Sequence, residues 1–134
     1  MKKIIFSLLI CSFLSSQENR PHGNQYNLPE LTKNNFLIGN LNENRLSYRV
    51  SYYDINIDFD IENQSLSGFV TIKAKSLIDL NKLQIDLAEN LNIEKITYKD
   101  KNLSFTRDFD AVLIDFSETI NKNKVFNFTV HYNG

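Results

Sequence analysis

The stretch "DINIDFDIENQSLSGFVTIKAK", Asp54 to Lys75, decides the fold, because apolar and polar side chains alternate along most of it. Oxygen-bearing side chains stand at every second position of its first half: Asp54, Asn56, Asp58, Asp60 and Glu62. Apolar residues fill the positions between them, which is typical of a half-buried β-strand. Residues 62–65 favour a turn, and the alternating run 66–75 completes an antiparallel hairpin.

The same row of acids has a second interpretation, because residues 54–58 match the opening of an EF-hand calcium loop. Position six of such a loop needs Gly and is Phe59 here, while position twelve needs Glu and is Ser65. Side chains on one strand face stand about 6.6 Å apart and parallel. A calcium ion needs its ligands within about 2.3–2.6 Å of one point. The row therefore predicts a solvated strand face, which we expect to pair with Lys73 and Lys75.

Composition and charge bound the protein class. The chain has 134 residues, enough for one domain, and is 42% hydrophobic and 23% charged. It can therefore bury a core and is not disordered by composition. The chain has 15 basic and 16 acidic residues, so it has no excess of positive charge that would attract nucleic acid. We therefore expect no nucleic-acid partner.

The N-terminus has the three parts of a secretory signal peptide. Lys2 and Lys3 precede an apolar run over residues 4–14, and small serines follow it. This run is too short to cross a bilayer of about 30 Å as a helix. We predict a signal peptide over residues 1–16, and export to the periplasm, the cell envelope or the medium, with no transmembrane segment after cleavage. The only cysteine, Cys11, lies inside it, so the mature chain would hold no disulfide.

The rest of the chain divides in two. Residues 17–45 are polar and contain both prolines, which predicts an irregular lead-in. Residues 46–134 continue the alternating pattern in short runs that polar turns separate. After the first hairpin, these runs cover residues 82–87, 91–98, 103–107, 111–116 and 125–132. Residues 99–102 are typical of a hairpin turn, and residues 117–124 also favour a turn. The pattern predicts an all-β fold, an antiparallel β-sandwich of about seven or eight strands.

Few residues offer chemistry. His22 and His131 are the only histidines, so no H-E-x-x-H motif exists, and there is neither a G-x-S-x-G elbow nor a Gly-rich phosphate loop. Gly68 indicates a bulge or a close backbone approach. The sequence thus predicts no catalytic, substrate-binding or metal-binding residue in this chain. The aromatic residues near the first hairpin are expected in the core, although an exposed carbohydrate-binding platform is the alternative: Tyr48, Tyr52, Tyr53, Phe59 and Phe69.

Four segments in order resemble one family. They are "YRVSYYDINIDFDIENQSLSG" (48–68), "LNKLQIDLAENLNIEKI" (80–96), "FTRDFDAVLIDF" (105–116) and "FNFTVHYNG" (126–134). Together they resemble the N-terminal domain of the aminopeptidase N family of gluzincin-type zinc metallopeptidases. Arg49 and Ile61 depart from the family's usual Asp and Pro.

This resemblance implies a saddle-like β-sandwich that precedes a separate catalytic domain. In the family that domain binds zinc through H-E-x-x-H and a distant Glu, and it hydrolyses peptides from their N-terminus. None of these motifs lies in residues 1–134. The resemblance therefore implies a non-catalytic N-terminal fragment, incomplete at its C-terminus, that shapes the substrate cleft. Its expected partners are the catalytic domain of the same polypeptide and the peptide substrates, with zinc in that domain and no cofactor in this chain.

A second hypothesis comes from a different functional class. The signal peptide, the strand pattern and the aromatic residues are also those of a free-standing exported β-sandwich that binds glycan or protein. The sequence alone leaves this alternative open, and it leaves the substrate preference of any parent peptidase undefined.

Overall fold

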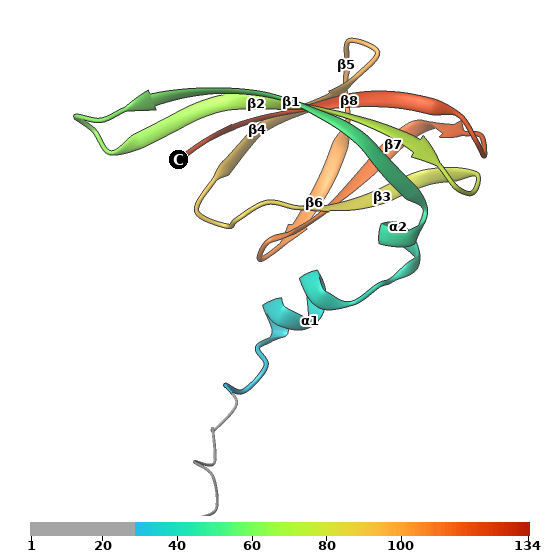
Figure 1. The fold of residues 1–134 in the computed structure, drawn as a ribbon, viewed down its shortest axis with the longest axis horizontal. Coiled ribbons are helices and arrows are strands. Elements are labelled where there is room, and N and C mark those ends of the chain that lie inside the picture. The colour runs from blue at the N-terminus through green and yellow to red at the C-terminus, as the bar shows by residue number, and fades with distance from the viewer. Residues whose placement is uncertain (1–28) are drawn as a thin grey trace, which may run out of the picture.

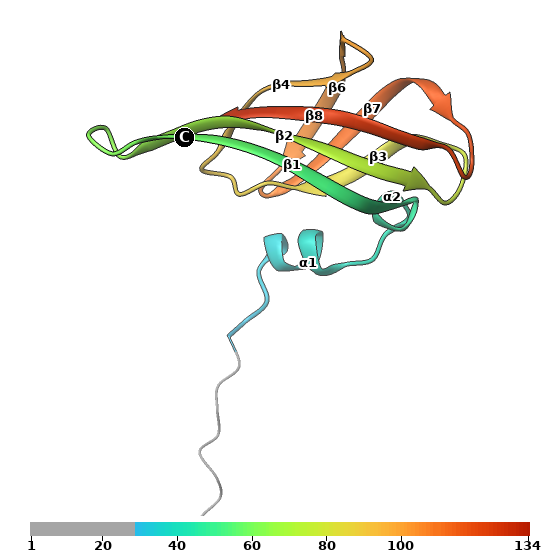
Figure 2. The same cartoon turned by 45° about the horizontal axis from the view of Figure 1, so that its top comes forward.

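The computed structural model describes residues 29–134 (Figure 1). The predicted signal peptide and the first part of the predicted lead-in lie outside the described residues. From residue 48 onward the chain forms two antiparallel sheets that face each other, with the chain's C-terminal strand inside the larger one (Figures 1 and 2).

The larger sheet has the strand order β1-β2-β8-β4-β5, and the smaller has the order β3-β7-β6. Their bounds are Tyr48–Asp60 (β1), Ser65–Ser76 (β2), Leu80–Asp86 (β3), Asn92–Tyr98 (β4), Lys101–Asn102 (β5), Ser104–Asp108 (β6), Ala111–Ile120 (β7) and Val125–Asn133 (β8). Every neighbouring pair is antiparallel. The prediction of an all-β antiparallel sandwich of seven or eight strands is confirmed.

The core lies between the sheets and is joined by aromatic rings. Phe116 on β7 meets Tyr98 on β4 edge to face, with ring centroids 5.2 Å apart. It meets Phe126 and Phe128 on β8 in the same way, at 5.8 and 6.0 Å. All four rings are buried. Since Phe116 belongs to the smaller sheet and its three neighbours to the larger one, this cluster holds the two sheets together.

Two short helices precede β1, so the prediction of an irregular lead-in is wrong over this part. They are α1 (Lys33–Gly39) and α2 (Glu43–Leu46). Thr32 and Asn42 cap their N-termini through side-chain oxygens, and Thr32 forms a capping box with Asn35. With seven and four residues, the helices are too short for a readable helical period. Neither of these helices is long and apolar enough to span a membrane.

The strand ends follow the turn residues in most places. Lys99 and Asp100 form the two-residue turn between β4 and β5, both with positive φ, as the predicted hairpin requires. The prediction of a turn over residues 117–124 is wrong in its first half. There β7 continues to Ile120, which pairs with Leu80 and is buried, while the polar residues between face solvent.

Gly68 confirms the predicted close backbone approach. A Cβ built on it would lie 2.1 Å from the carbonyl oxygen of Asn56 on β1. We expect Gly68→Ala to push β1 away from β2 and to lower the free energy of unfolding by about 1–3 kcal/mol. Urea unfolding measures the change. Gly39→Ala is the control, because no atom lies within 4 Å of its added Cβ. Equal stability of the two variants would contradict this contact.

Candidate docking surface

Beyond Val50, the described residues leave the inner face of β1 uncovered, and this overturns part of the sequence-based prediction. Its apolar side chains were expected in the core, yet Tyr53, Ile55, Ile57 and Phe59 are 53%, 59%, 42% and 67% exposed, and Ile61 just beyond β1 is 87% exposed. We call these five residues the docking strip. The first four alternate along β1, opposite Ile72, Val70, Gly68 and Leu66 of β2, which lie on the face toward the core; Ile61 follows in the turn.

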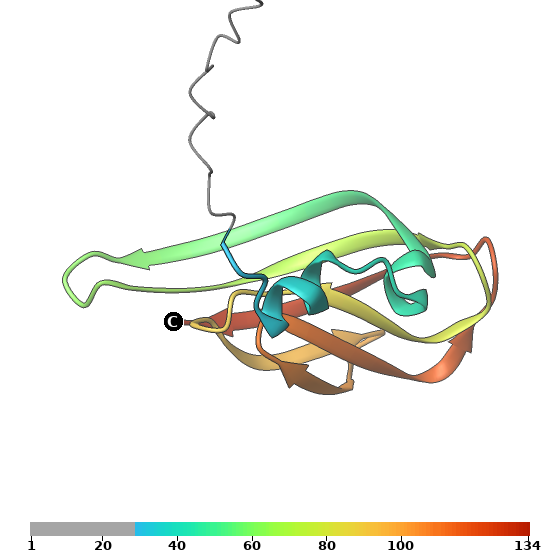
Figure 3. The same cartoon turned by 90° about the horizontal axis from the view of Figure 1, so that it is seen from below.

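The geometry of the sandwich explains this exposure. β1 is the edge strand of the larger sheet, and the smaller sheet has only three strands to cover five. The β1–β2 hairpin therefore extends past the end of the smaller sheet (Figure 3). Tyr48 and Val50, at the start of β1, still pack against the core. The remainder of the inner face of β1 has no covering layer among the described residues.

The outer face of β1 carries the predicted acidic row: Asp54, Asn56, Asp58, Asp60 and Glu62. Across the ladder the first four lie opposite residues 71, 69, 67 and 65. The predicted pairing with the lysines of β2 is wrong, because Lys73 lies opposite Tyr52 and Lys75 opposite Arg49. The turn after Asp60 sets this register, and it places both lysines opposite the start of β1, ahead of the acidic row.

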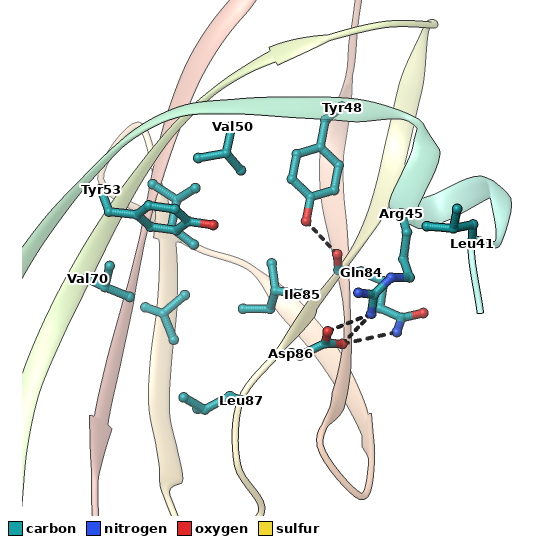
Figure 4. A pocket seen from close by; sticks show the side chains of 12 residues that line it. Leu41, Arg45, Tyr48, Val50, Tyr53, Val70, Gln84, Ile85, Asp86 and Leu87 are labelled. Carbon is teal, nitrogen blue, oxygen red and sulfur yellow. Dashed lines mark hydrogen bonds and ion pairs between the residues drawn. The ribbon is translucent and has the colours of Figure 1, made fainter. Parts of the chain in front are cut away.

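A cavity of about 390 Å³ opens where the docking strip meets the sandwich, between β1, β2 and β3 (Figure 4). Its wall is largely apolar and includes Val70, Ile72 and Ile85. Its rim carries an ion pair, in which Arg45 Nη1 donates to both carboxylate oxygens of Asp86 at 2.6 Å. The cavity can therefore take an apolar group and offers charged groups only at its edge.

A hydrogen-bond network beside this cavity fixes the lead-in on the sandwich. The Tyr48 hydroxyl donates to the carbonyl oxygen of Gln84 at 2.7 Å. The buried Gln84 amide donates to the carbonyl oxygen of Leu37 in α1 and accepts from Asn42. Burial is the main reason that the pKa of Tyr48 rises from 10.0 to about 12, with Tyr53 acting in the same direction and Arg45 against it.

This pKa predicts a loss of stability at high pH. The folded state holds the Tyr48 proton more tightly than the unfolded state, so its contribution is complete below about pH 10 and is lost between about pH 10 and 12. The contribution is at most about 3 kcal/mol, since each pKa unit corresponds to about 1.4 kcal/mol. Urea unfolding at pH 9 and pH 11 should show a smaller drop for Tyr48→Phe than for the unsubstituted chain. Tyr52→Phe, at an exposed position, is the control; a drop unchanged in Tyr48→Phe would refute the assignment.

A second cavity, of about 400 Å³, lies at the other end of the docking strip. Phe59, Ile61 and Leu66 of the hairpin line it together with Leu91 and Gly134. The strip therefore runs between two apolar hollows, each large enough for a bulky side chain. Such hollows beside an exposed apolar row are typical of surfaces that bind the anchoring side chains of a protein partner.

Arg107 on β6 holds the loop that forms one wall of this second cavity. Its guanidinium donates to the carbonyl oxygens of Leu87, Ala88 and Leu91, each at 2.6 Å. Its Nε also donates to the carbonyl oxygen of Phe109 at 2.8 Å. The loop between β3 and β4 is thus fixed by charge-assisted hydrogen bonds.

His131 is the one histidine within the described residues. It lies beside Phe69 on the outer face of the larger sheet, with ring centroids 5.5 Å apart and ring planes tilted by 39°. Within residues 29–134, no three His, Cys, Asp or Glu side chains gather so that they could hold a metal ion. The resemblance places zinc in the separate catalytic domain and assigns no ligand to residues 29–134.

Comparisons with known proteins give a match in fold. No protein-family model and no curated protein matches the chain. Among solved structures, it is similar to a two-domain M1 zinc metallopeptidase variant bound to L-arginine, with 15% identity and a TM-score of 0.60 over 68% of this chain. An M1 zinc metallopeptidase from Deinococcus radiodurans has 14% identity and a TM-score of 0.58 over 68% of this chain. The native leukotriene A4 hydrolase from Saccharomyces cerevisiae has 18% identity and a TM-score of 0.54 over 66% of this chain.

The chain spans only a small part of these proteins: 21% of each M1 zinc metallopeptidase and 15% of the yeast hydrolase. The fold expected from the resemblance is present, with the docking strip as its uncovered face. This chain therefore has the β-sandwich fold that forms part of M1 zinc metallopeptidases and of leukotriene A4 hydrolase.

Proposed function

We propose that this chain is the non-catalytic N-terminal β domain of an exported zinc aminopeptidase, and that it docks on the catalytic domain through the docking strip. One observation carries the proposal: in a fold shared with M1 zinc metallopeptidases, the described residues leave the five apolar residues of the docking strip without cover. Burying an exposed Ile or Phe contributes about 1.5–3 kcal/mol. A contiguous apolar surface of this kind marks an interaction site.

In this proposal the peptidase chemistry belongs to the catalytic domain. Zinc, bound there, would polarise the scissile peptide group. This chain supplies a wall: docked through the strip, it narrows the access to the cleft and restricts substrates by size. The carboxylates of the acidic row lie on the outer face of β1, the face opposite the docking strip, and play no part in the hydrolysis.

The test has two steps. First, the reading frame is followed beyond Gly134; the proposal expects an H-E-x-x-H motif with a distant Glu. A stop codon there, or a long continuation without that motif, would contradict the proposal. Second, the catalytic part is assayed with amino-acid anilides and with longer peptides, with and without this domain. Loss of the domain should change the preference for peptide length.

A second candidate is the free-standing exported module that binds glycan or protein. The exposure of Tyr52 and Tyr53 on opposite faces of β1 favours it, because exposed aromatic rings can stack on sugars. Polysaccharide pull-down separates the two candidates. Binding that Tyr52→Ala and Tyr53→Ala abolish, in a chain with no peptidase continuation, would favour the module.

A further inference from the structure

The open edge of β1 is a separate feature from the docking strip. Among residues 29–134, β1 is the last strand of its sheet, and β2 pairs with only one of its two edges. Over residues 51–60 every side chain is exposed. A long, unpaired edge presents backbone N–H and C=O groups on which another strand can form a ladder.

The two faces of this edge have different chemistry. The docking strip lies on the inner face and the acidic row on the outer face, alternating residue by residue. The ion pairs found in the described residues involve other carboxylates: Asp86, Asp108, Asp115 and Glu118. Asp60 accepts hydrogen bonds from the backbone and side chain of Asn63 in the turn. Asp54 and Asp58 lie directly opposite Thr71 and Ser67, so neither faces a basic residue across the ladder.

This pattern disfavours a second copy of the chain as the occupant. An antiparallel β1–β1 pair that continues the sheet would place outer-face residues opposite outer-face residues. In three of the four registers that keep Asp54 opposite an acidic-row residue within β1, it meets an Asp of the other copy, and like charges directly opposite each other destabilise a sheet. The acidic row therefore opposes self-association of the edge.

We infer that the β1 edge takes up, by strand addition, an extended segment that alternates apolar residues with Lys or Arg. The apolar residues of that segment lie beside the docking strip, and its basic residues pair with the acidic row. The segment belongs to the catalytic part of the same polypeptide, so this inference rests on the proposed function. It adds the mode of contact and the chemistry of the contacting strand.

The probe is a nine-residue capped peptide in which Lys alternates with Val or Ile, and fluorescence anisotropy measures its binding to the full 134-residue chain. We expect the same peptide with Glu in place of Lys to bind at least about tenfold more weakly, and added salt to reduce this difference. The Asp54→Lys/Asp58→Lys variant should bind the Glu peptide more tightly than the Lys peptide. The control is Glu30→Lys/Glu43→Lys, which changes the net charge by the same amount outside β1 and should still prefer the Lys peptide.

N-methylation tests strand addition itself. Successive amides of a strand point to opposite sides, so only every second amide of the peptide can bond to β1. Methylating one alternate set should abolish binding, while methylating the other set should leave it unchanged. Equal binding of the two methylated peptides, or equal binding of the Lys and Glu peptides, would overturn the inference and leave the proposed docking through the strip standing.

The source of the segment is tested with the full-length polypeptide. If its own strand occupies β1, the Lys peptide should bind at least about tenfold more weakly there than to this chain. Unchanged binding to the full-length polypeptide would overturn the assignment to the catalytic part.

Discussion

We expect the double substitution Ile57→Lys/Phe59→Lys to leave this chain folded and to weaken its binding to the catalytic part of the proposed peptidase by about a hundredfold or more. Both side chains are exposed in this chain, so the change costs little here. In the complex each buried side chain would contribute about 1.5–3 kcal/mol, and 1.4 kcal/mol corresponds to a factor of ten. Isothermal titration of the two separately expressed parts measures the change.

A matched control for this result lies on the far side of the same sheet. Val125 and Asn127 are exposed on the outer face of β8. Val125→Lys/Asn127→Lys adds the same charge and should leave the affinity within about a factor of three. An affinity unchanged by the substitutions in the docking strip, with the fold intact, would show that another surface makes the contact.

Phe116→Ala should produce the largest loss of stability, about 3–5 kcal/mol, since it empties the centre of the aromatic cluster that joins the two sheets. Three edge-to-face contacts are lost with it, to Tyr98, Phe126 and Phe128. A domain of this size typically has only about 5–15 kcal/mol in total, so the variant should be markedly unstable. Thermal and urea unfolding measure the loss.

Phe109→Ala is the control for Phe116→Ala, because the same change is made at an exposed ring in the turn between β6 and β7. The Lys33 ammonium lies over its ring, 5.4 Å from the ring centroid, in a cation–π contact. We expect a change below about 1 kcal/mol. Similar losses in both variants would contradict the role of the Phe116 cluster.

The strands could be predicted from the sequence because alternation is a local property. The hairpin of Asp54 to Lys75, the two-residue turn at Lys99 and Asp100, and the close approach at Gly68 all follow from neighbouring residues. The two lead-in helices could not be predicted in this way. They are too short to show a helical period, and they depend on capping residues and on contacts such as Arg45 with Asp86.

The docking strip could not be predicted for a different reason. Alternation shows that Tyr53, Ile55, Ile57 and Phe59 share a face, but it cannot show whether another layer covers that face. Coverage depends on how many strands the second sheet has and where they lie. A usable signal was the length of β1: its 13 residues exceed the 7 of β3, so part of its inner face had to extend past the smaller sheet.

Thiol labelling tests the docking surface most directly. In a Cys11→Ser background, a cysteine is placed on the docking strip by Ile57→Cys or on the outer face of β8 by Val125→Cys. Its labelling rate is then compared between this chain and the full-length polypeptide. We predict that Ile57→Cys reacts at least about tenfold more slowly in the full-length polypeptide, while Val125→Cys reacts equally fast in both. Equal, fast labelling of Ile57→Cys in both proteins would contradict a docked β1.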